Sequence, residues 1–279
     1  STLLRAINGL TPVVRGSVSV NDGAAMVNVT NADPATLRRI RQNQIAMVFQ
    51  QFGLLPWRTV QENVGLGLEL SGQARSERAS KVDQQLALVG LSDWADRKVG
   101  ELSGGMQQRV GLARAFATDA PILLMDEPFS ALDPLIRTRL QDELLDLQKE
   151  LRRTIIFVSH DLDEAFKLGN RIAIMEGGRI VQCGTPQEIF TNPKTGYVAE
   201  FVAHMNPLGV LTARDVMDAP TEVLPLQVGK FTPVREILEL MTDTENRVSV
   251  MHDGVLIGDV SRAQAIAGLL DPRGLSNIG

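Results

Sequence analysis

The residues best placed to do chemistry lie in one stretch, LSGGMQQRVGLARAFATDAPILLMDEPFSALD, which covers residues 102–133. Ser103 precedes two glycines and a helical pattern, so its side chain can cap a helix whose glycines let a ligand approach the backbone. Free N–H groups and the positive end of the helix dipole favour an anion such as phosphate there. A capped turn without a ligand is the alternative interpretation of these residues.

Two carboxylates and a histidine follow apolar runs of the sequence. The run ILLMD ends at Asp126 and leads to Glu127, and the run TIIFV (154–158) leads to His160. In α/β folds, ligands bind at the carboxyl ends of parallel strands. Asp126 there suits a ligand of Mg²⁺, Glu127 a proton acceptor for an attacking water, and His160 a contact to a terminal phosphate. A solvated acidic turn and a structural histidine are the alternatives for each residue taken alone.

These side chains need elements to hold them, and the sequence alternates strand and helix signals. Short apolar runs rich in Ile and Val predict buried strands at 45–49, 122–126, 154–158 and 171–175. Apolar residues at helical spacing predict amphipathic helices over 79–89 and 135–151. The alternation predicts an α/β fold with a largely parallel sheet, and MEGGRIV (175–181) predicts a hairpin at the edge of that sheet.

Composition narrows the classes of function. The chain has 279 residues, 28 of them basic and 33 acidic, with a net charge of −5 and no basic cluster, so no nucleic-acid partner is expected. The single Cys183 allows no intrachain disulfide, and no His or Cys spacing predicts a structural metal site. No apolar run approaches the roughly 18 residues that span a bilayer, so we expect a chain in solution or peripheral to a membrane.

The order of these motifs resembles one family, the ATP-binding subunits of ABC transporters. LSGGM is similar to the ABC signature, ILLMDEP to the Walker B strand, SALD to the D-loop, VSHD to the switch-histidine segment, and VFQQF to the Q-loop centred on Gln50. The resemblance covers about residues 1–200. It implies a P-loop NTPase fold, the ABC ATPase domain, with a helical subdomain.

The resemblance also implies roles for the site residues. ATP would lie between the two subunits of a homodimer, against the phosphate loop of one and the signature of the other. Glu127 would activate the water, His160 would stabilise the transferring phosphoryl group, and Gln50 would sense Mg²⁺ and the water. The residues implied in ATP binding are Ser1, Thr2, Ser103, Gly104, Gly105, Gln107 and Asp133, with Asp133 also linking the two subunits. Ser1, Gln50 and Asp126 would hold Mg²⁺.

The first residues, STLLRAINGL, resemble the last position of the phosphate-binding loop G-x-x-x-x-G-K-[ST] and the helix that follows it. The resemblance implies that the lysine and both glycines of that loop, and the first strand, precede Ser1. Because the loop N–H groups and the lysine hold the phosphates, a chain that starts at Ser1 is expected to bind ATP weakly and to hydrolyse it negligibly. The complete protein is expected to do both.

Two features favour transport. The 51 residues between Gln50 and the signature suit a small helical subdomain and are too few for the long coiled coil of DNA-repair ABC ATPases. The segment FGLLPWRTVQENV (52–64) places apolar residues beside a proline, where the family receives the coupling helix of an integral-membrane permease. A loop that faces the core is the alternative for this segment.

Later segments resemble one group of bacterial importers. QCGTPQEIFTNP (182–193) and VAEFVAHMNPLGVLTARDVM (198–217) are similar to importers of quaternary amines, namely choline, glycine betaine and proline betaine, and choline is favoured among these. The resemblance implies a peripheral subunit on the cytoplasmic face of the bacterial inner membrane, served indirectly by a periplasmic substrate-binding protein. An importer of another small solute is the alternative.

The helical pattern stops at Pro207 and Gly209, which predicts an ATP-binding domain over 1–203, a linker at 204–210 and a second domain over 211–279. The second domain has a helix–strand–strand–helix pattern that resembles a single α+β CBS module. Such modules normally work in pairs, so with one copy in this chain an adenosine-type regulatory site is expected only if pairing across the dimer supplies the second copy. Sensing of ionic strength is a further role that the resemblance implies.

Two functions of other kinds remain open at this stage. One is an ABC protein that works without a membrane partner, although such proteins usually carry two cassettes and this chain has one signature. The other is an inactive regulatory subunit, against which Asp126, Glu127 and His160 argue.

Overall fold

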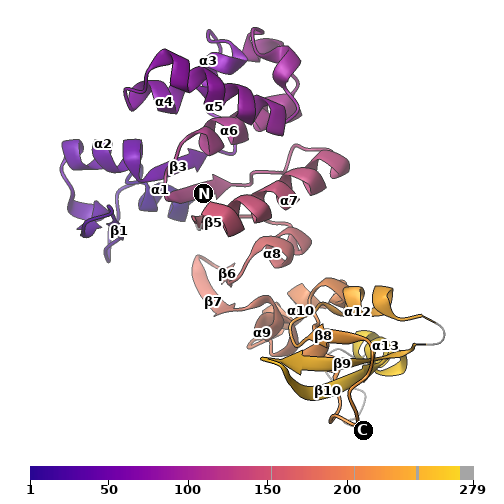
Figure 1. The fold of residues 1–279 in the computed structure, drawn as a ribbon. Helices are drawn as coiled ribbons and strands as arrows, with labels where there is room; N and C mark the ends of the chain where they lie inside the picture. Colours follow the sequence, from indigo (N-terminus) through magenta and orange to yellow (C-terminus); the bar gives the residue numbers. More distant parts are fainter. Residues whose placement is uncertain (152, 204, 243–244, 271–279) are drawn as a thin grey trace. The chain divides into compact units, whose positions relative to one another are not determined.

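The computed structural model describes residues 1–151, 153–203, 205–242 and 245–270 (Figure 1). Contacts within the chain divide it into two compact units, Ser1–His160 and Asp161–Gly279, and each is described by itself. This division does not coincide with the linker expected at 204–210, so the domain boundaries proposed from the sequence stay a prediction. None of the described helices is long and apolar enough to cross a membrane.

A parallel sheet forms the centre of the first unit. Its strands β3 (Ile45–Val48), β4 (Ile122–Asp126) and β5 (Thr154–Val158) lie in the order β3-β4-β5. In the register, Met125 of β4 pairs with Val48 of β3 and Phe157 of β5, so all three strands end at the same edge. The strands predicted at 45–49, 122–126 and 154–158 are thus confirmed as strands, but no residue of β5 is buried, so the expected burial is wrong for that strand.

A small core lies beside the first strand of this sheet. It joins Leu4 of α1 (Thr2–Ile7) and Ile40 of α2 (Pro34–Asn43) to Ile45 and Leu124 of the sheet. Val20 of β1 (Ser19–Asn21) and Val29 of η1 (Val29–Asn31) complete it, and β1 pairs antiparallel with β2 (Met26–Asn28). The side chain of Arg41 donates to the carbonyls of Asn8 and Gly9. Arg41 therefore caps the C-terminal end of α1, the helix that begins at Thr2.

Helix α6 (Gly104–Ala117) connects the sheet to a helical group, as Figure 1 shows. The group comprises α3 (Val60–Val64), α4 (Leu66–Leu70) and α5 (Arg75–Leu88), with the short helices η2 (Ser92–Trp94) and η3 (Val99–Glu101). Helix α6 packs against β3 and against α3, α4 and α5, so most of its second half is buried. The helix predicted over 79–89 corresponds to α5, which buries Val82 and Leu86. The helix predicted over 135–151 is α7 (Pro134–Leu151).

The second unit begins with α8 (Leu162–Leu168) and a hairpin of β6 (Ile172–Glu176) and β7 (Arg179–Gly184). The predicted hairpin is confirmed, with Gly177 and Gly178 both at positive φ in its turn. Its predicted membership of the parallel sheet is a correction, because among the described residues β6 pairs with β7 and the two form a sheet of their own. Only Ile174 of β6 is buried.

The rest of the second unit contains the predicted helix–strand–strand–helix pattern. These elements are α12 (Val234–Leu240), β9 (Arg247–His252), β10 (Val255–Ser261) and α13 (Arg262–Leu270). A short strand β8 (Gln227–Gly229), which the sequence did not predict, pairs parallel with β9 and makes the order β10-β9-β8. The remaining helices are α9 (Pro186–Thr191), α10 (Gly196–Val202), η4 (Pro207–Gly209) and α11 (Ala213–Val216).

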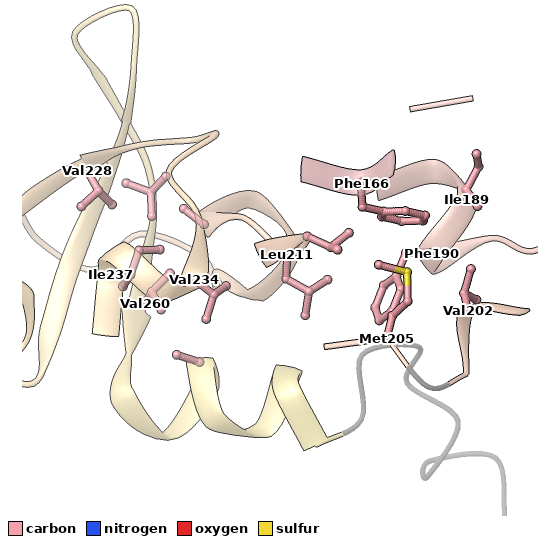
Figure 2. Close-up of a cluster of buried hydrophobic side chains, with 14 of the residues drawn as sticks. Phe166, Ile189, Phe190, Val202, Met205, Leu211, Val228, Val234, Ile237 and Val260 are labelled. Atoms are coloured by element: carbon pink, nitrogen blue, oxygen red, sulfur yellow. The ribbon is translucent and has the colours of Figure 1, made fainter. Parts of the chain in front are cut away.

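One apolar cluster of the second unit includes residues from α8 to α13 (Figure 2). Phe166, Phe190 and Met205 gather at one end of this cluster, and Ile237 and Val260 lie at the other. Residues before position 204 and residues after position 210 therefore share the same core.

Strand β10 lies at the edge of its sheet, and a loop residue covers part of that edge. Asp218 and Asp259 exchange backbone hydrogen bonds of 3.0 and 3.2 Å. The register shifts between Leu256 and Gly258, and a Cβ built on Gly258 would lie 2.6 Å from the carbonyl oxygen of Asp218. Glycine is therefore needed where the loop crosses the edge.

Candidate active site

The carboxyl ends of the three parallel strands bring together the residues predicted to do chemistry. Gln50 follows β3, Asp126 ends β4 with Glu127 next to it, and His160 comes shortly after β5. Because the strands are parallel and in register, these residues lie along one edge of the sheet. The predicted grouping at the strand ends is thus present in the structure.

Asp126 is the buried carboxylate of this edge. It is 2% exposed, and its Oδ1 has no hydrogen-bond partner among the described residues. The amino nitrogen of Ser1, at the start of α1, lies 3.4 Å from this oxygen. Mg²⁺ prefers oxygen ligands, so a buried carboxylate oxygen that accepts no hydrogen bond, beside a serine residue, fits the predicted magnesium site. Thr2 is the exposed first residue of α1.

Glu127 and His160 lie next to each other. His160 Nδ1 is 3.4 Å from Glu127 Oε2, and the side chains are 72% and 24% exposed, respectively. The N–H of Glu127 donates to the carbonyl of Val158 at 2.9 Å, which ties the end of β4 to the end of β5. Both side chains are thus open to solvent and close enough to act on one reacting group.

The backbone of Glu127 has a conformation that is rare for its residue type. Its φ is +49°, in the left-handed region, where a residue other than glycine needs support from its neighbours. Its carbonyl oxygen accepts hydrogen bonds from Gln108 Nε2 and from Ser130 Oγ, both at 3.1 Å. The catalytic candidate is therefore held through its peptide group as well as its strand.

Gln108 supplies part of that support, and the sequence analysis did not single it out. Its side chain is 1% exposed, donates to the Glu127 carbonyl and accepts the N–H of Ala131 at 3.0 Å. Gln108, Leu112 and Ala115 are all buried and recur at i, i+4 and i+7 on α6. A polar residue in such an apolar stripe is the signal that could have found it, because a buried amide needs partners.

The first turn of α6 has the features of an anion site. Ser103 caps the helix, as predicted, and its Oγ accepts the N–H of Met106 at 3.4 Å. A Cβ built on Gly104 would meet no atom within 4 Å, whereas one on Gly105 would lie 3.0 Å from the carbonyl oxygen of Ala131. Gly104 thus leaves the helix N-terminus open, and Gly105 lets α6 approach the D-loop.

Gln107 and Asp133 both form hydrogen bonds with nearby backbone groups. Gln107 Nε2 donates to the carbonyls of Val99 and Leu102 at 3.1 and 3.2 Å, so its amide holds the turn before the signature. Asp133 Oδ1 accepts the N–H of Ile136 at 3.1 Å and caps α7. Their predicted contacts with ATP stay predictions.

The turn that contains Gln50 is fastened to α6. Gln50 itself is exposed, and Phe52 and Gly53, two and three residues further on, have φ of 59° and 55°. The guanidinium of Arg114 donates to both of their carbonyls, at 2.7 and 2.8 Å. Burial lowers the pKa of Arg114 below its ordinary value, so the carbonyl dipoles must stabilise a desolvated charge. The sequence analysis did not single out Arg114.

The segment expected to meet a membrane subunit is partly exposed. Trp57 is 68% exposed, while Leu54 and Leu55 are half-buried. The buried side chain of Asn63 accepts the N–H of Leu55 at 2.8 Å and donates to its carbonyl at 3.1 Å, which fixes the loop. Leu55 and Trp57 thus lie on a held loop rather than wholly in the core.

Comparison with known proteins gives a consistent set of relatives. Residues 1–130 match the family model described as "ABC transporter". The chain is 44% identical over 277 residues to the glycine betaine/proline betaine transport system ATP-binding protein ProV of Salmonella typhimurium, covering 99% of this chain and 68% of that protein. It is 51% identical over 217 residues to the glycine betaine transport ATP-binding protein OpuAA of Bacillus subtilis. That match covers 78% of this chain and 51% of that protein.

Two further similarities extend the set. The trimethylamine N-oxide transport system ATP-binding protein TmoW of Ruegeria pomeroyi is 43% identical over 97% of this chain and 78% of its own length. Among solved structures, the ATP-binding cassette MJ0796, as a post-hydrolysis dimer bound to ADP and Pi, has a TM-score of 0.61 at 33% identity. That match covers 66% of this chain and 79% of the cassette.

Proposed function

Because the chain belongs to the family of ABC transporter ATP-binding subunits, we propose that it hydrolyses ATP to power import of a small quaternary amine, with glycine betaine as the first candidate. The observation that carries the ATPase part is the approach of Glu127 to His160 beside the buried Asp126, at the carboxyl ends of three parallel strands. The substrate class rests on similarity, over most of the chain, to ATP-binding proteins of glycine betaine/proline betaine and trimethylamine N-oxide transport systems.

Each residue at the sheet edge has a part in this reaction. Glu127 accepts a proton from the water that attacks the terminal phosphate, and His160, 3.4 Å from it, donates to the transferring phosphoryl group. Asp126, Gln50 and the hydroxyl of Ser1 would hold Mg²⁺, which would supply positive charge beside the phosphate oxygens. Ser1 and Thr2 also bind the phosphates from the start of α1.

The site is complete only in a homodimer. The open N-terminus of α6, at Ser103, Gly104 and Gly105, faces the phosphates of the partner's ATP, and Gln107 and Asp133 contribute near it. Association of two subunits and hydrolysis are thereby linked, and closure moves the membrane permease through the loop of Leu55 and Trp57.

The same proposal assigns the subunit a place at the membrane and its second domain a regulatory role. The subunit lies on the cytoplasmic face of the bacterial inner membrane, bound to permease subunits, and a periplasmic binding protein delivers the amine. Selection of the amine belongs to the binding protein and the permease, because the ATP-binding subunit does not contact it. Residues 211–279 form a CBS-like regulatory module, which α12, β9, β10 and α13 support within the described residues.

The test is a transport assay in liposomes. A subunit that carries the whole phosphate-binding loop is reconstituted with its permease and binding protein, and ATPase and uptake are measured with glycine betaine, proline betaine, choline and trimethylamine N-oxide in turn. ATPase stimulated by binding protein loaded with one of these amines, together with uptake of that amine, is the expected result. ATPase that responds to none of them would refute the substrate class and leave the ATPase assignment intact.

A further inference from the structure

We propose that Gln108 is the positioning residue that couples the two ATP sites of the dimer to each other. It ties the backbone of Glu127, which acts on the ATP bound by its own subunit, to the helix α6 whose N-terminus faces the partner's ATP. The inference rests on the proposed function, because it needs the two-subunit arrangement described above.

The first observation is that the Gln108 amide is fully used and fully buried. Its Nε2 donates to the Glu127 carbonyl at 3.1 Å and its Oε1 accepts the Ala131 N–H at 3.0 Å, while the side chain is 1% exposed. Solvent therefore cannot replace either partner. An amide held at both ends in a buried place fixes the distance between the two peptide groups that it joins.

The second observation is the conformation of the peptide that it holds. Glu127 has a φ of +49° without being glycine, so its backbone costs free energy that surrounding contacts must offset. Gln108 is the contact from α6 to that peptide, whereas Ser130, which also donates to the Glu127 carbonyl, lies on the same loop. A displacement of α6 would thus act directly on the orientation of the Glu127 carboxylate.

The third observation places the N-terminus of α6 against the same loop. Gly105 lies three residues before Gln108, and therefore on the same face of the helix. A Cβ added to Gly105 would lie only 3.0 Å from the Ala131 carbonyl oxygen. Ala131 is the residue whose N–H Gln108 binds. The first turn of α6 and the D-loop therefore contact each other at two successive positions along one face of the helix.

These contacts give a path from one ATP to the other. When the partner's ATP draws in the first turn of α6, Gln108 carries that displacement to Ala131 and to the Glu127 peptide. Glu127 then reaches its working position only when the opposite site is engaged. Cooperative hydrolysis in the dimer is the consequence, and Gln108 is the side chain on which it depends.

The test replaces Gln108 by Met, which is similar in length but makes neither hydrogen bond. It uses the complete subunit with its permease in liposomes. We expect kcat to fall about tenfold or more, the Hill coefficient for ATP to fall towards 1, and the equilibrium affinity for ATP to stay within about twofold. Gln108→Glu keeps an acceptor for the Ala131 N–H and loses the donor to Glu127, so its Hill coefficient should fall as well.

Gln182 provides a matched control. It is 5% exposed, donates to the Asn192 carbonyl at 3.1 Å and accepts the Lys194 N–H at 2.8 Å, but it lies in the second unit. Gln182→Met should lower thermal stability by a similar amount and leave the Hill coefficient unchanged. This control separates coupling from a general loss of stability.

The outcomes can be told apart. An active, cooperative wild type whose Gln108→Met and Gln108→Glu variants keep the wild-type Hill coefficient would overturn the coupling role and leave the proposed function standing. A drop in kcat alone, with cooperativity unchanged, would also overturn it, because that result describes a local effect on Glu127. A wild type without ATPase activity would remove the proposed function and the inference together.

Discussion

Glu127 combines a solvent-accessible carboxylate with a constrained peptide, so substitutions that change only the carboxylate test its chemistry. In a subunit that carries the whole phosphate-binding loop, Glu127→Gln keeps the shape of the side chain and removes its ability to accept a proton. We expect ATP turnover to fall by a factor of about 10²–10⁴, with ATP-bound dimers accumulating because closure no longer leads to hydrolysis. Phosphate release and gel filtration with ATP measure the two effects, and near-normal turnover in the variant would exclude Glu127 as the base.

Gly104 and Gly105 are adjacent glycines with different surroundings. An alanine Cβ at position 105 would lie 3.0 Å from the Ala131 carbonyl oxygen, whereas one at position 104 would meet nothing within 4 Å. We expect Gly105→Ala to lower the free energy of unfolding by about 1 kcal/mol or more, because overpacking outweighs the gain in helix propensity. Gly104→Ala should be neutral or slightly stabilising. Urea unfolding of the two variants decides the matter, and equal midpoints would contradict the close approach of α6 to the D-loop.

Asp259 is a buried carboxylate that makes stability depend on pH. Burial by itself raises the pKa of Asp259. The hydrogen bonds from Thr221, the positive charge of Arg247 and the hydrogen bond from Ser249 together outweigh burial, and they lower the pKa below its ordinary value of 3.8. A lowered pKa gives stability that is present above pH 3.8 and is lost as the pH falls through the folded-state value. Asp259→Asn should therefore cost about 1–3 kcal/mol at pH 7, and the difference from wild type should shrink at acidic pH.

Unfolding by urea between neutral pH and pH 3 measures this difference. Asp253→Asn is the control, because its side chain is 88% exposed and asparagine tolerates the positive φ of that position. A difference between wild type and Asp259→Asn that does not change with pH would show that the carboxylate charge contributes nothing.

The positions of the candidate catalytic residues could be predicted from the sequence, and the residues that hold them could not. Asp126, Glu127 and His160 follow apolar runs, so their positions at strand ends were readable from local pattern. Gln108 and Arg114 bind backbone carbonyls that are 19 and 61–62 residues away in the chain. Contacts over such separations depend on tertiary packing and leave no local signal other than a polar residue within an apolar stripe.

At the scale of elements, helix α6 supports three parts of the site. Its first turn is the open N-terminus, Gln108 contacts the Walker B strand end and the D-loop, and Arg114 fastens the turn after Gln50. One helix that touches all three parts must move as a rigid body with them. A rearrangement of the helical group around α6 is therefore expected to change the positions of Gln50 and Glu127 together.

Arg114 and Arg109 allow this role to be tested on one helix. Arg114→Met leaves the carbonyls of Phe52 and Gly53 without their donors, and we expect a loss of about 1–3 kcal/mol and faster exchange of the amides of residues 49–53. Arg109 makes a similar contact, donating to the Val89 carbonyl at 2.9 Å, and burial also lowers its pKa although Asp133 opposes this. Arg109→Met should leave exchange in 49–53 unchanged. Equal exchange in both variants would contradict the fastening role of Arg114.

The strands were predictable to different degrees, for a physical reason. Runs such as ILLMD are apolar on both faces, which is typical of a central parallel strand, and β4 is indeed paired on both sides. The run at 171–175 is also apolar, but the two glycines after it allow a tight turn, and local pairing with β7 satisfies its backbone. Strand β8 has three residues, too few for a period to be visible in the sequence.

At the scale of the whole molecule, the core of the second unit crosses the linker predicted at 204–210. Phe166, Ile189, Phe190 and Val198 pack in the same cluster as Val234, Ile237 and Val260. A fragment that covers residues 161–279 should therefore unfold cooperatively, whereas a fragment that covers 211–279 should melt at a lower temperature and with a broader transition. Circular dichroism of both fragments measures this, and equal melting temperatures would favour 204–210 as the domain boundary.

The covered edge of β10 has a consequence for behaviour at high concentration. Exposed sheet edges recruit strands from other molecules and begin aggregation. The backbone bonds between Asp218 and Asp259 occupy part of this edge, and the register shift at Leu256 and Gly258 makes it irregular. Fewer free N–H and C=O groups of β10 are therefore available to a strand of another molecule, which reduces the tendency of the native subunit to aggregate through this edge.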